Sequence, residues 1–307
     1  PTYQSAWLKT HYPAAFFSGV LTHDPGMYPK RLIVDEVRQM GITIAPLDVN
    51  ASDSVYRVED HGNAIRIALS TVAGISDAEV QSIIAGRPYI DLNDFVRRSG
   101  CSTPVTESLI LTGGFDSLHA DVNRRDLLLH FSDLQKSPSA AVSGAQMNLG
   151  FEPPALISSG LPAMTASESV KYEIDRLGID MSRHLIEFYG EFLNAIGAVR
   201  SSDLLKQRSQ SSVLVAGIKV AMQTPPVRSG KRVIFLTLDD GYGCSDSTFF
   251  TDVQSEYANV LYSTSLLLVR GVTRRTGARG ISIRATGAWD LRAAYESWSA
   301  KQSTLAI

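Results

Sequence analysis

The sequence contains only two cysteines among 307 residues, Cys101 and Cys244, and they lie far apart in the chain. A disulfide framework is therefore not expected, and two thiols in a reducing cytoplasm are predicted instead. No apolar run is long enough to span a bilayer, so we expect no contact with a membrane. The chain also starts without methionine and without a signal sequence, which suggests a piece of a longer cytoplasmic protein.

The sequence also has little net charge. Its 29 Lys and Arg residues against 31 Asp and Glu residues give a formal charge of −2. This excludes a uniformly basic surface, so any contact with nucleic acid has to be local. A hydrophobic fraction of 44% and a charged fraction of 20% are ordinary for globular proteins, which excludes disordered and collagen-like classes. The length allows two or three domains with their own cores.

Residues arranged for catalysis are missing as well. The six histidines are scattered, without the spacing of a metal site. Asp239 and Asp240 precede Gly241, which is typical of a turn, and no Asp-x-Asp pair offers carboxylates for two-metal phosphoryl transfer. Asp35 and Glu36 are expected on an exposed helix face, and no phosphate-binding loop of the Walker type is found. We therefore expect neither catalytic nor metal-binding residues in this chain.

Two glycine-containing corners lie in a region, residues 56 to 135, that reads as helical. The first corner precedes a helix expected over Asp77–Ala85, and the second, a weaker copy, follows a helix expected over Val105–Thr112. A helix-hairpin-helix of this kind holds a duplex phosphate on backbone N–H groups and reads no bases. The alternative is a purely structural corner, which is common in helical proteins. The candidate DNA-binding residues are Gly74, Ile75, Ser76, Gly113 and Gly114.

Residues 136 to 165 are rich in Ser, Ala, Gly and Pro, which predicts a flexible linker. Within it, a glutamine is followed by apolar residues and a final aromatic residue. An extended peptide of this kind places apolar anchors in a groove while its amide hydrogen-bonds at the rim, as sliding-clamp-binding peptides do. The alternative is an accidental match in a disordered connector. The candidate residues are Gln146, Met147, Leu149 and Phe151.

The last third of the chain is predicted to form a five-stranded barrel. The expected strands are rich in β-branched and bulky apolar residues, and a short helix over Val253–Leu261 separates the third from the fourth. Three strands, a helix and two strands are the plan of an OB-fold, which binds oligonucleotides or oligosaccharides. The five strands are expected at Val213–Gln223, Lys231–Asp240, Ser247–Thr251, Leu266–Val272 and Gly280–Thr286.

The loops of this barrel are basic. Residues 213 to 290 hold nine Lys and Arg against six Asp and Glu, a net charge of +3 in a chain of −2. Positive loops combined with aromatic side chains are typical of surfaces that bind single-stranded DNA. The alternative is a small β-barrel with an ordinary solvated surface. The candidate contacts are Arg228, Lys231, Arg232, Phe235, Phe249, Arg274, Arg275 and Arg279.

These parts, in this order, resemble the C-terminal part of a bacterial C-family DNA polymerase, the polymerase III alpha subunit. Residues 6–17 (AWLKTHYPAAFF) look like the end of the fingers domain, and residues 46–50 (PLDVN) like the segment after it. Residues 173–184 (EIDRLGIDMSRH) are similar to the connector before the OB domain. Gln223 to Pro226 and Phe235 to Asp240 look closer to the error-prone branch, which acts in mutagenic translesion synthesis.

The resemblance predicts a multi-domain α + β fold and a domain order. A helical remnant of the fingers is followed by a tandem helix-hairpin-helix domain and then by an OB-fold barrel. A first helix is expected around Ala6–Leu21, a second over Pro29–Met40 that Gly41 stops, a short strand over Ile42–Ile44, and a helical connector over Ser167–Leu177 and then Met181–Ile196. The expected divisions are the fingers end (1–55), the helix-hairpin-helix domain (56–135), the linker (136–165), the connector (166–208), the OB-fold domain (209–292) and a tail (293–307).

The resemblance also implies a function in DNA repair. The parent would be a DNA-directed DNA polymerase that needs Mg²⁺, while this chain lacks the palm and would need no cofactor. Implied partners are duplex and single-stranded DNA, the mutasome adaptor ImuB and the sliding clamp. Two departures matter: Ser76 replaces the second glycine usual in the hairpin, and the clamp peptide matches only approximately. The alternatives are a replicative alpha subunit, a non-polymerase DNA-binding repair module, and an OB-fold scaffold for proteins.

Overall fold

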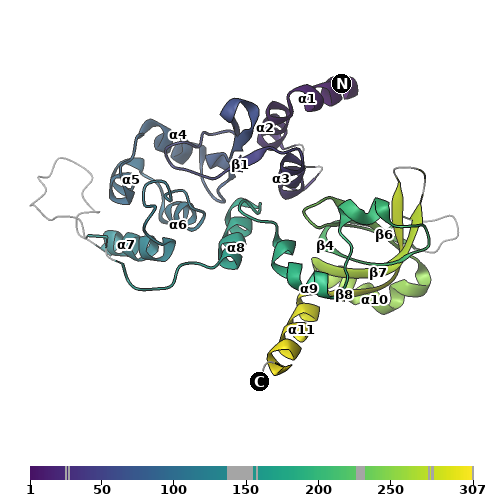
Figure 1. Cartoon of the computed structure of the whole chain (residues 1–307). Coiled ribbons are helices and arrows are strands. Elements are labelled where there is room, and N and C mark those ends of the chain that lie inside the picture. The colour runs from purple at the N-terminus through teal and green to yellow at the C-terminus, as the bar shows by residue number, and fades with distance from the viewer. Residues whose placement is uncertain are drawn as a thin grey trace, which may run out of the picture. The chain divides into compact units, whose positions relative to one another are not determined.

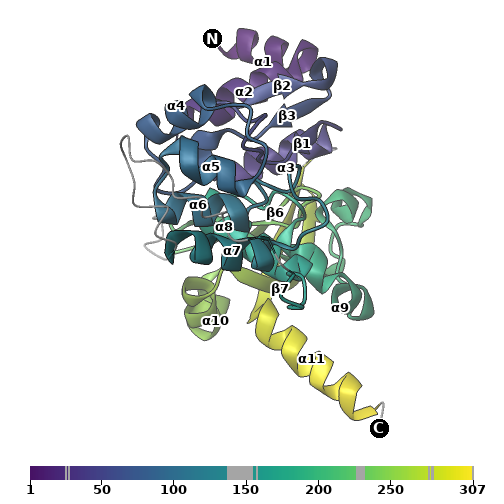
Figure 2. The same ribbon diagram turned by 90° about the vertical axis from the view of Figure 1, so that its left-hand side faces the viewer.

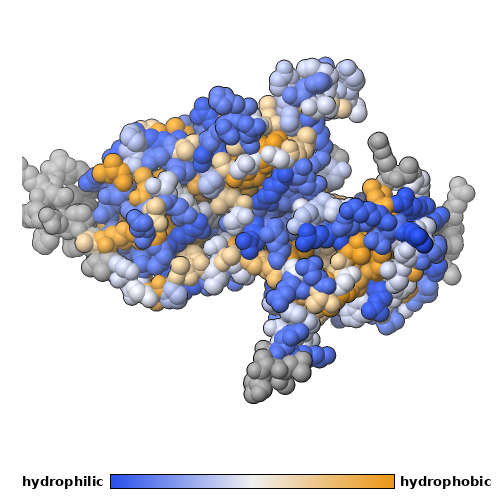
Figure 3. Space-filling view, viewed as in Figure 1, coloured by the Kyte–Doolittle hydropathy of each residue, from blue (hydrophilic) through white to orange (hydrophobic). Residues whose placement is uncertain are grey.

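The protein divides into two compact units, Pro1–Arg183 and His184–Ile307 (Figure 1). The computed structural model describes residues 1–305 except for residues 25, 27, 137–154, 157, 226–231, 276 and 278–279. Hydrophilic side chains cover most of the visible surface of each unit, with smaller apolar patches between them (Figure 3). The finer domain divisions expected from the sequence stay predictions.

The first unit starts with two helices, α1 (Thr2–His11) and α2 (Pro13–His23), where a single helix is expected from the sequence. That prediction is wrong because Pro13 has no N–H to donate and disfavours helical angles in the residue before it. Tyr12 accordingly adopts φ −137° and ψ 58°. Helix α2 buries Phe17 and Leu21, whereas α1 buries none of its side chains.

Helix α3 (Lys30–Gln39) ends as predicted at Gly41, which has a φ of +78°. The N–H of Gly41 donates to the Arg38 carbonyl, and the N–H of Ile42 donates to the Val37 carbonyl, a Schellman end. The expectation for Asp35 is wrong: this side chain is buried and forms an ion pair with Arg38 (Nη1 to Oδ1, 2.8 Å). The buried side of α3 therefore contains the Asp35 carboxylate, paired with Arg38, among apolar side chains.

A small sheet follows α3. Its order is β1 (Thr43–Ala45), β3 (Ala64–Arg66) and β2 (Arg57–Glu59), with β3 parallel to β1 and antiparallel to β2. The 3₁₀ turn η1 (Asp60–Gly62) connects β2 to β3. Only the first of these strands is expected from the sequence. The other two have three residues each, too few for an alternating pattern to stand out.

The rest of the first unit is helical (Figure 2). Its elements surround an aromatic centre in which Phe95 lies edge-on to Tyr89 and to Phe115, each at 4.9 Å between ring centroids. All three rings are buried. The elements are η2 (Leu69–Thr71), α4 (Asp77–Ala85), α5 (Leu92–Ser99), α6 (Thr103–Leu111), α7 (Arg124–Lys136) and α8 (Ala166–Leu177).

The second unit is a closed barrel of strand order β4-β5-β6-β8-β7, as the OB-fold plan predicts. Its core is apolar and includes Phe249 from β6 and Ile283 from β8. Helix α10 (Thr251–Ser263) lies between the third and fourth strands in sequence, as predicted. The strands are β4 (Ser212–Gln223), β5 (Ile234–Asp239), β6 (Cys244–Phe249), β7 (Leu266–Arg275) and β8 (Ile281–Asp290).

Short elements flank the barrel. The helix expected over Met181–Ile196 is instead the 3₁₀ turn η4 (Leu185–Tyr189) and α9 (Gly190–Ala195), and η5 (Ser201–Lys206) leads into β4. Helix α11 (Leu291–Leu305) continues directly from β8. Tyr295 and Trp298 of α11 lie against Phe192 of α9, with ring centroids 5.9 and 5.5 Å away. The beginning of the predicted tail is therefore packed on the barrel unit.

Candidate nucleic-acid interface

The first predicted hairpin is a corner between η2 and α4. Its leading element is a single 3₁₀ turn, not the helix expected from the sequence. Gly74 is exposed at φ +79°, a conformation that glycine adopts without strain. The N–H of Ile75 donates to the Val72 carbonyl and that of Ser76 to Glu79. Of the backbone N–H groups of Gly74, Ile75 and Ser76, that of Gly74 is the one without a hydrogen-bond partner among the described residues.

Glu79 occupies the anion-attracting ends of two helices. Its Oε2 accepts the N–H and hydroxyl of Ser76, the N-cap of α4, at 2.9 and 2.8 Å. Its Oε1 accepts the N–H and hydroxyl of Ser102, the N-cap of α6, at 2.9 and 2.7 Å. These hydrogen bonds, those from Ser102 first, lower the pKa of Glu79 to about 2. A DNA phosphate at α4 would compete with this carboxylate.

The carboxylate of Glu79 should make stability depend on acid. Because the folded pKa of about 2 lies below the usual 4.5, its stabilisation is complete above pH 4.5 and is lost as the pH falls toward 2. We expect Glu79→Gln to lower the melting temperature at pH 7 and to match the parent chain near pH 2. Thermal unfolding across this range measures the difference. A difference in melting temperature between the two proteins that stays constant with pH would contradict the lowered pKa of Glu79.

The second predicted hairpin is the end of α6. Gly113, at φ +86°, donates its N–H to the Ile110 carbonyl, and Gly114 donates to the Leu109 carbonyl at 2.7 Å. This is a Schellman motif, so both N–H groups are used inside the protein. Arg124 covers Gly113, because a Cβ there would lie 2.3 Å from its Nη2. The proposed phosphate contacts of Gly113 and Gly114 would therefore need the helix end to open.

The predicted contacts on the barrel differ in accessibility. Arg232 and Arg274 are exposed, and Phe235 on β5 is 45% exposed. The expectation that Phe249 stacks on a base is wrong, because its ring is fully buried in the barrel core. Arg275 is exposed but donates to the carbonyls of Leu205 and Gln207, which ties β7 to η5. Arg228, Lys231, Arg279, Gln146, Met147, Leu149 and Phe151 lie outside the described residues.

Two arginine–aromatic pairs of the barrel are not predicted from the sequence. The guanidinium of Arg284 on β8 lies 5.4 Å from the ring centroid of Phe250, and that of Arg270 on β7 lies 5.3 Å from the indole of Trp289. The alternation along β8 could have indicated that Arg284 is exposed, because it lies between the buried residues Ile283 and Ala285. Arg284 and Thr286 therefore face outward, and the alternation ends at the consecutive buried residues Gly287 and Ala288.

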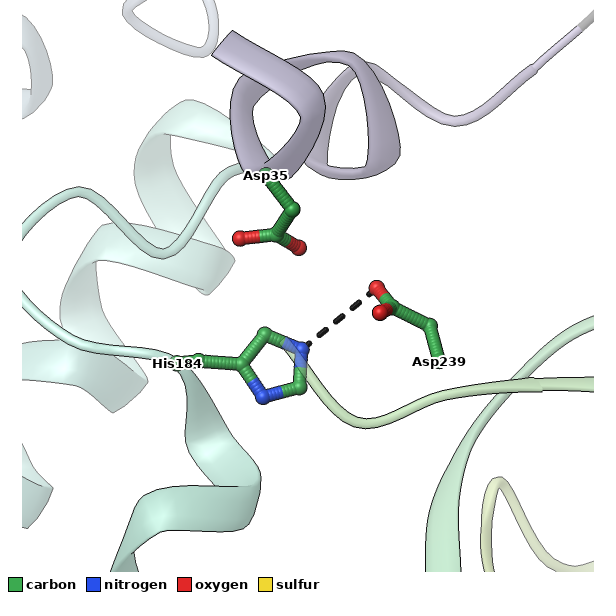
Figure 4. A group of neighbouring side chains, drawn as sticks. All are labelled: Asp35, His184 and Asp239. Atoms are coloured by element: carbon green, nitrogen blue, oxygen red, sulfur yellow. Dashed lines mark ion pairs between the residues drawn. The ribbon is translucent and has the colours of Figure 1, made fainter. Parts of the chain in front are cut away.

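Asp239 and Asp240 form the turn that the sequence predicts. Asp239 accepts the N–H of Gly241 and Asp240 that of Tyr242, each at 3.0 Å. His184 lies 3.5 Å from Asp239 (Nε2 to Oδ2), and both side chains are buried (Figure 4). The Nδ1 of His184 accepts the N–H of Ile186, so its proton is assigned to Nε2. This pair anchors the turn between β5 and β6.

In the described part of either unit, no three histidine, cysteine or carboxylate side chains lie close enough to share an ion. Among the described residues, no helix is both long and apolar enough to cross a membrane.

A mostly helical unit with glycine corners followed by a closed five-stranded barrel defines a multi-domain protein of the α + β class. The family profile described as "Helix-hairpin-helix motif" matches residues 41–127, which confirms the prediction of this motif for the region. Among solved structures, the chain is similar to the mitochondrial single-stranded DNA binding protein of S. cerevisiae, at 12% identity and a TM-score of 0.23, over 27% of this chain and 97% of that one. A likeness at that level supports no functional conclusion.

Curated proteins that are similar to the chain along most of its length are bacterial DNA polymerases. The chain is 30% identical to the error-prone DNA polymerase of Symbiobacterium thermophilum, over 92% of this chain and 30% of the relative. The corresponding protein of Bdellovibrio bacteriovorus is 29% identical over 90% of this chain and 27% of its own length. The DNA polymerase III subunit alpha of Vibrio cholerae is 27% identical over 97% of this chain and 27% of its own.

The chain is thus homologous, along nearly its whole length, to bacterial error-prone DNA polymerases and DNA polymerase III alpha subunits. This confirms the resemblance found in the sequence. The chain spans less than a third of the length of these relatives.

Proposed function

We propose that the chain is the DNA-binding region of an error-prone DNA polymerase that acts in translesion synthesis and DNA repair. The observation that carries the proposal is the similarity to such polymerases over about nine-tenths of the chain, which includes both compact units. The chain would hold DNA, while nucleotidyl transfer would occur in a palm elsewhere in the parent protein. The parent would work in the cytoplasm.

The residues of the chain support holding DNA rather than catalysis. The exposed Gly74 N–H is suited to one duplex phosphate, while Arg232, Arg274 and Phe235 offer charge and a ring to a single strand. The Mg²⁺ that supports phosphoryl transfer would be bound by the parent's palm, outside this chain.

Two protein partners belong to the same proposal. The adaptor ImuB would recruit the parent polymerase to the lesion, and residues 146–151 would bind the sliding clamp. A direct binding measurement of the chain to the clamp, with Gln146→Ala and Leu149→Ala combined, tests the second contact. If the double variant binds the clamp as tightly as the parent chain does, residues 146–151 are a connector and not the clamp contact.

The proposed function predicts DNA binding without synthesis. Purified chain, mixed with primer-template, Mg²⁺ and the four nucleotides, should bind the DNA in a salt-dependent way and extend no primer. Gel-resolved extension and fluorescence anisotropy on the same sample measure both quantities. Templated extension would contradict the non-catalytic role, and absence of binding at low salt would contradict the whole proposal in favour of a protein scaffold.

A pair of glycines offers a matched test of the hairpin. Gly74 (φ +79°) and Gly41 (φ +78°) carry the same backbone strain if replaced, and neither has a heavy atom within 4 Å of a Cβ built on it. Gly74→Val should weaken duplex binding by a similar factor for all DNA sequences, because a phosphate contact carries no base information. Gly41→Val should leave affinity unchanged. Equal affinities of the two variants for duplex would make the hairpin purely structural.

A replicative role is the second candidate, because the alpha subunit of Vibrio cholerae matches 97% of the chain at 27% identity. The two candidates differ in partners. Specific binding of the chain or its parent to ImuB would favour the error-prone role, and a chain and parent that bind the clamp but show no affinity for ImuB would favour the replicative one.

A further inference from the structure

The outer surface of the barrel carries a groove where β7 and β8 meet the start of α10. Its volume is about 510 Å³, within the range of pockets that hold small organic groups. Val272 and Thr286 line the groove from the sheet, and Phe250 and Asp252 line it from the start of α10. Both the strands and the helix belong to the second unit, and α10 lies beside β8 in Figure 1.

Positive charge dominates this groove. Arg274 and Arg284 line it, and both are exposed. The only carboxylate among the lining residues is Asp252, 3.7 Å from Arg284. Arg270 is exposed on β7, and its carbonyl accepts the hydroxyl of Thr286, which lines the groove. Within the described residues, Arg274 has no hydrogen bond or ion pair through its side chain, so its charge is available to a ligand.

The groove also offers flat apolar surface beside the charges. Phe250 is 38% exposed, with the Arg284 guanidinium 5.4 Å from its centroid. Outside the lining residues of the groove, Trp289, 37% exposed, makes the equivalent pair with Arg270 on the same barrel. A nucleic-acid strand presents phosphates and π-faces alternately, which matches guanidinium and aromatic groups placed side by side. An acidic peptide would use the charges and leave the rings without a stacking partner.

We propose that this groove between β7, β8 and α10 is a binding site for single-stranded DNA. Arg274 and Arg284 neutralise phosphates there, and Phe250 stacks on a base. The inference rests on the proposed function, because it assumes that the barrel binds DNA. The inference goes beyond the proposed function by placing the DNA strand on β7 and β8. The OB-fold plan instead favours the surface of the second and third β-strands, here β5 and β6 with Phe235.

The test uses the 307-residue chain and an unstructured oligothymidylate, with affinity measured by fluorescence anisotropy over a series of salt concentrations. Arg274→Gln combined with Arg284→Gln should lower the magnitude of the log-affinity against log-salt slope by about 1.4, about 0.7 for each lost phosphate contact. Arg292→Gln, which removes an exposed arginine of α11, is the matched control and should keep the parent slope.

The stacking contribution is tested separately. Phe250→Leu should weaken binding between about 5-fold and about 150-fold without changing the salt slope, because a lost stack removes no charge. Phe250→Tyr keeps the ring and should keep most of the affinity. Thermal unfolding of every variant verifies that the barrel is intact, so a loss of affinity can be assigned to the groove.

Three results would overturn the inference. If all groove variants bind DNA like the parent while Phe235→Leu loses affinity, the strand lies on β5 and β6, and the proposed function stands without the inference. If the groove variants lose binding to polyglutamate but not to DNA, the groove is a site for acidic peptides. If the parent chain itself does not bind the oligonucleotide, the inference and the proposed function both fail.

Discussion

Phe95→Ala is expected to lower the free energy of unfolding of the first unit by about 3–5 kcal/mol. Phe95 is fully buried and stands between Tyr89 and Phe115, with ring centroids 4.9 Å from each. Its removal takes away apolar burial and two edge-to-face contacts and leaves a cavity that rigid neighbours cannot fill. Denaturant unfolding followed by circular dichroism measures the loss.

The control for Phe95 is an exposed apolar residue of the same unit. Leu129 of α7 is 46% exposed, so Leu129→Ala should change the free energy by less than about 1 kcal/mol. Equal effects of the two variants would mean that the aromatic centre does not hold the helical region together. The helix-hairpin-helix corner could then not be treated as a rigid platform for DNA.

Gly271→Ala is expected to destabilise the barrel by about 1–3 kcal/mol or more. A Cβ at this position would lie 2.4 Å from the Ile283 Cγ2 and 2.5 Å from the Arg284 carbonyl oxygen. The register between β7 and β8 shifts at Gly271, so the two backbones approach too closely for any side chain. Thermal or denaturant unfolding of the variant measures the effect.

Gly190→Ala is the matched substitution in the same unit. Gly190 starts α9 with helical angles, and nothing lies within 4 Å of a Cβ there. Alanine should therefore be neutral or stabilise the unit by up to about 1 kcal/mol, because it restricts the unfolded chain. If both alanine variants had the same stability as the parent, the close contact between β7 and β8 would be contradicted.

The barrel could be predicted because its strands are long and rich in β-branched residues. The predicted β4 differs from the observed strand by one residue, β7 starts at the predicted Leu266 but continues three residues further to Arg275, and α10 extends two residues beyond its predicted range at each end. Boundaries failed where local chemistry competes with the apolar pattern. The helix expected across Tyr12 and Pro13 breaks there, since proline constrains its neighbour. Thr251, expected in the third strand, instead begins α10.

The candidate site was harder to predict because accessibility depends on tertiary packing. Phe235 and Phe249 are both aromatic residues of predicted strands, yet one faces outward and the other lies in the core. Ser102 donates hydrogen bonds to the Glu79 carboxylate from 23 positions away in the sequence. No local sequence pattern therefore reveals that this carboxylate accepts hydrogen bonds at the start of α4, beside the hairpin. Arg284 was missed because its partner Phe250 belongs to a different element.

The central claim is that this chain binds single-stranded DNA through phosphate charge on its barrel. The most direct measurement is the affinity of the intact chain for an unstructured oligonucleotide across a range of salt concentrations. The account predicts a straight line of log affinity against log salt, with a slope of magnitude about 2 if Arg232, Arg274 and Arg284 each contact one phosphate. An affinity that does not change with salt, or no binding at low salt, would contradict it.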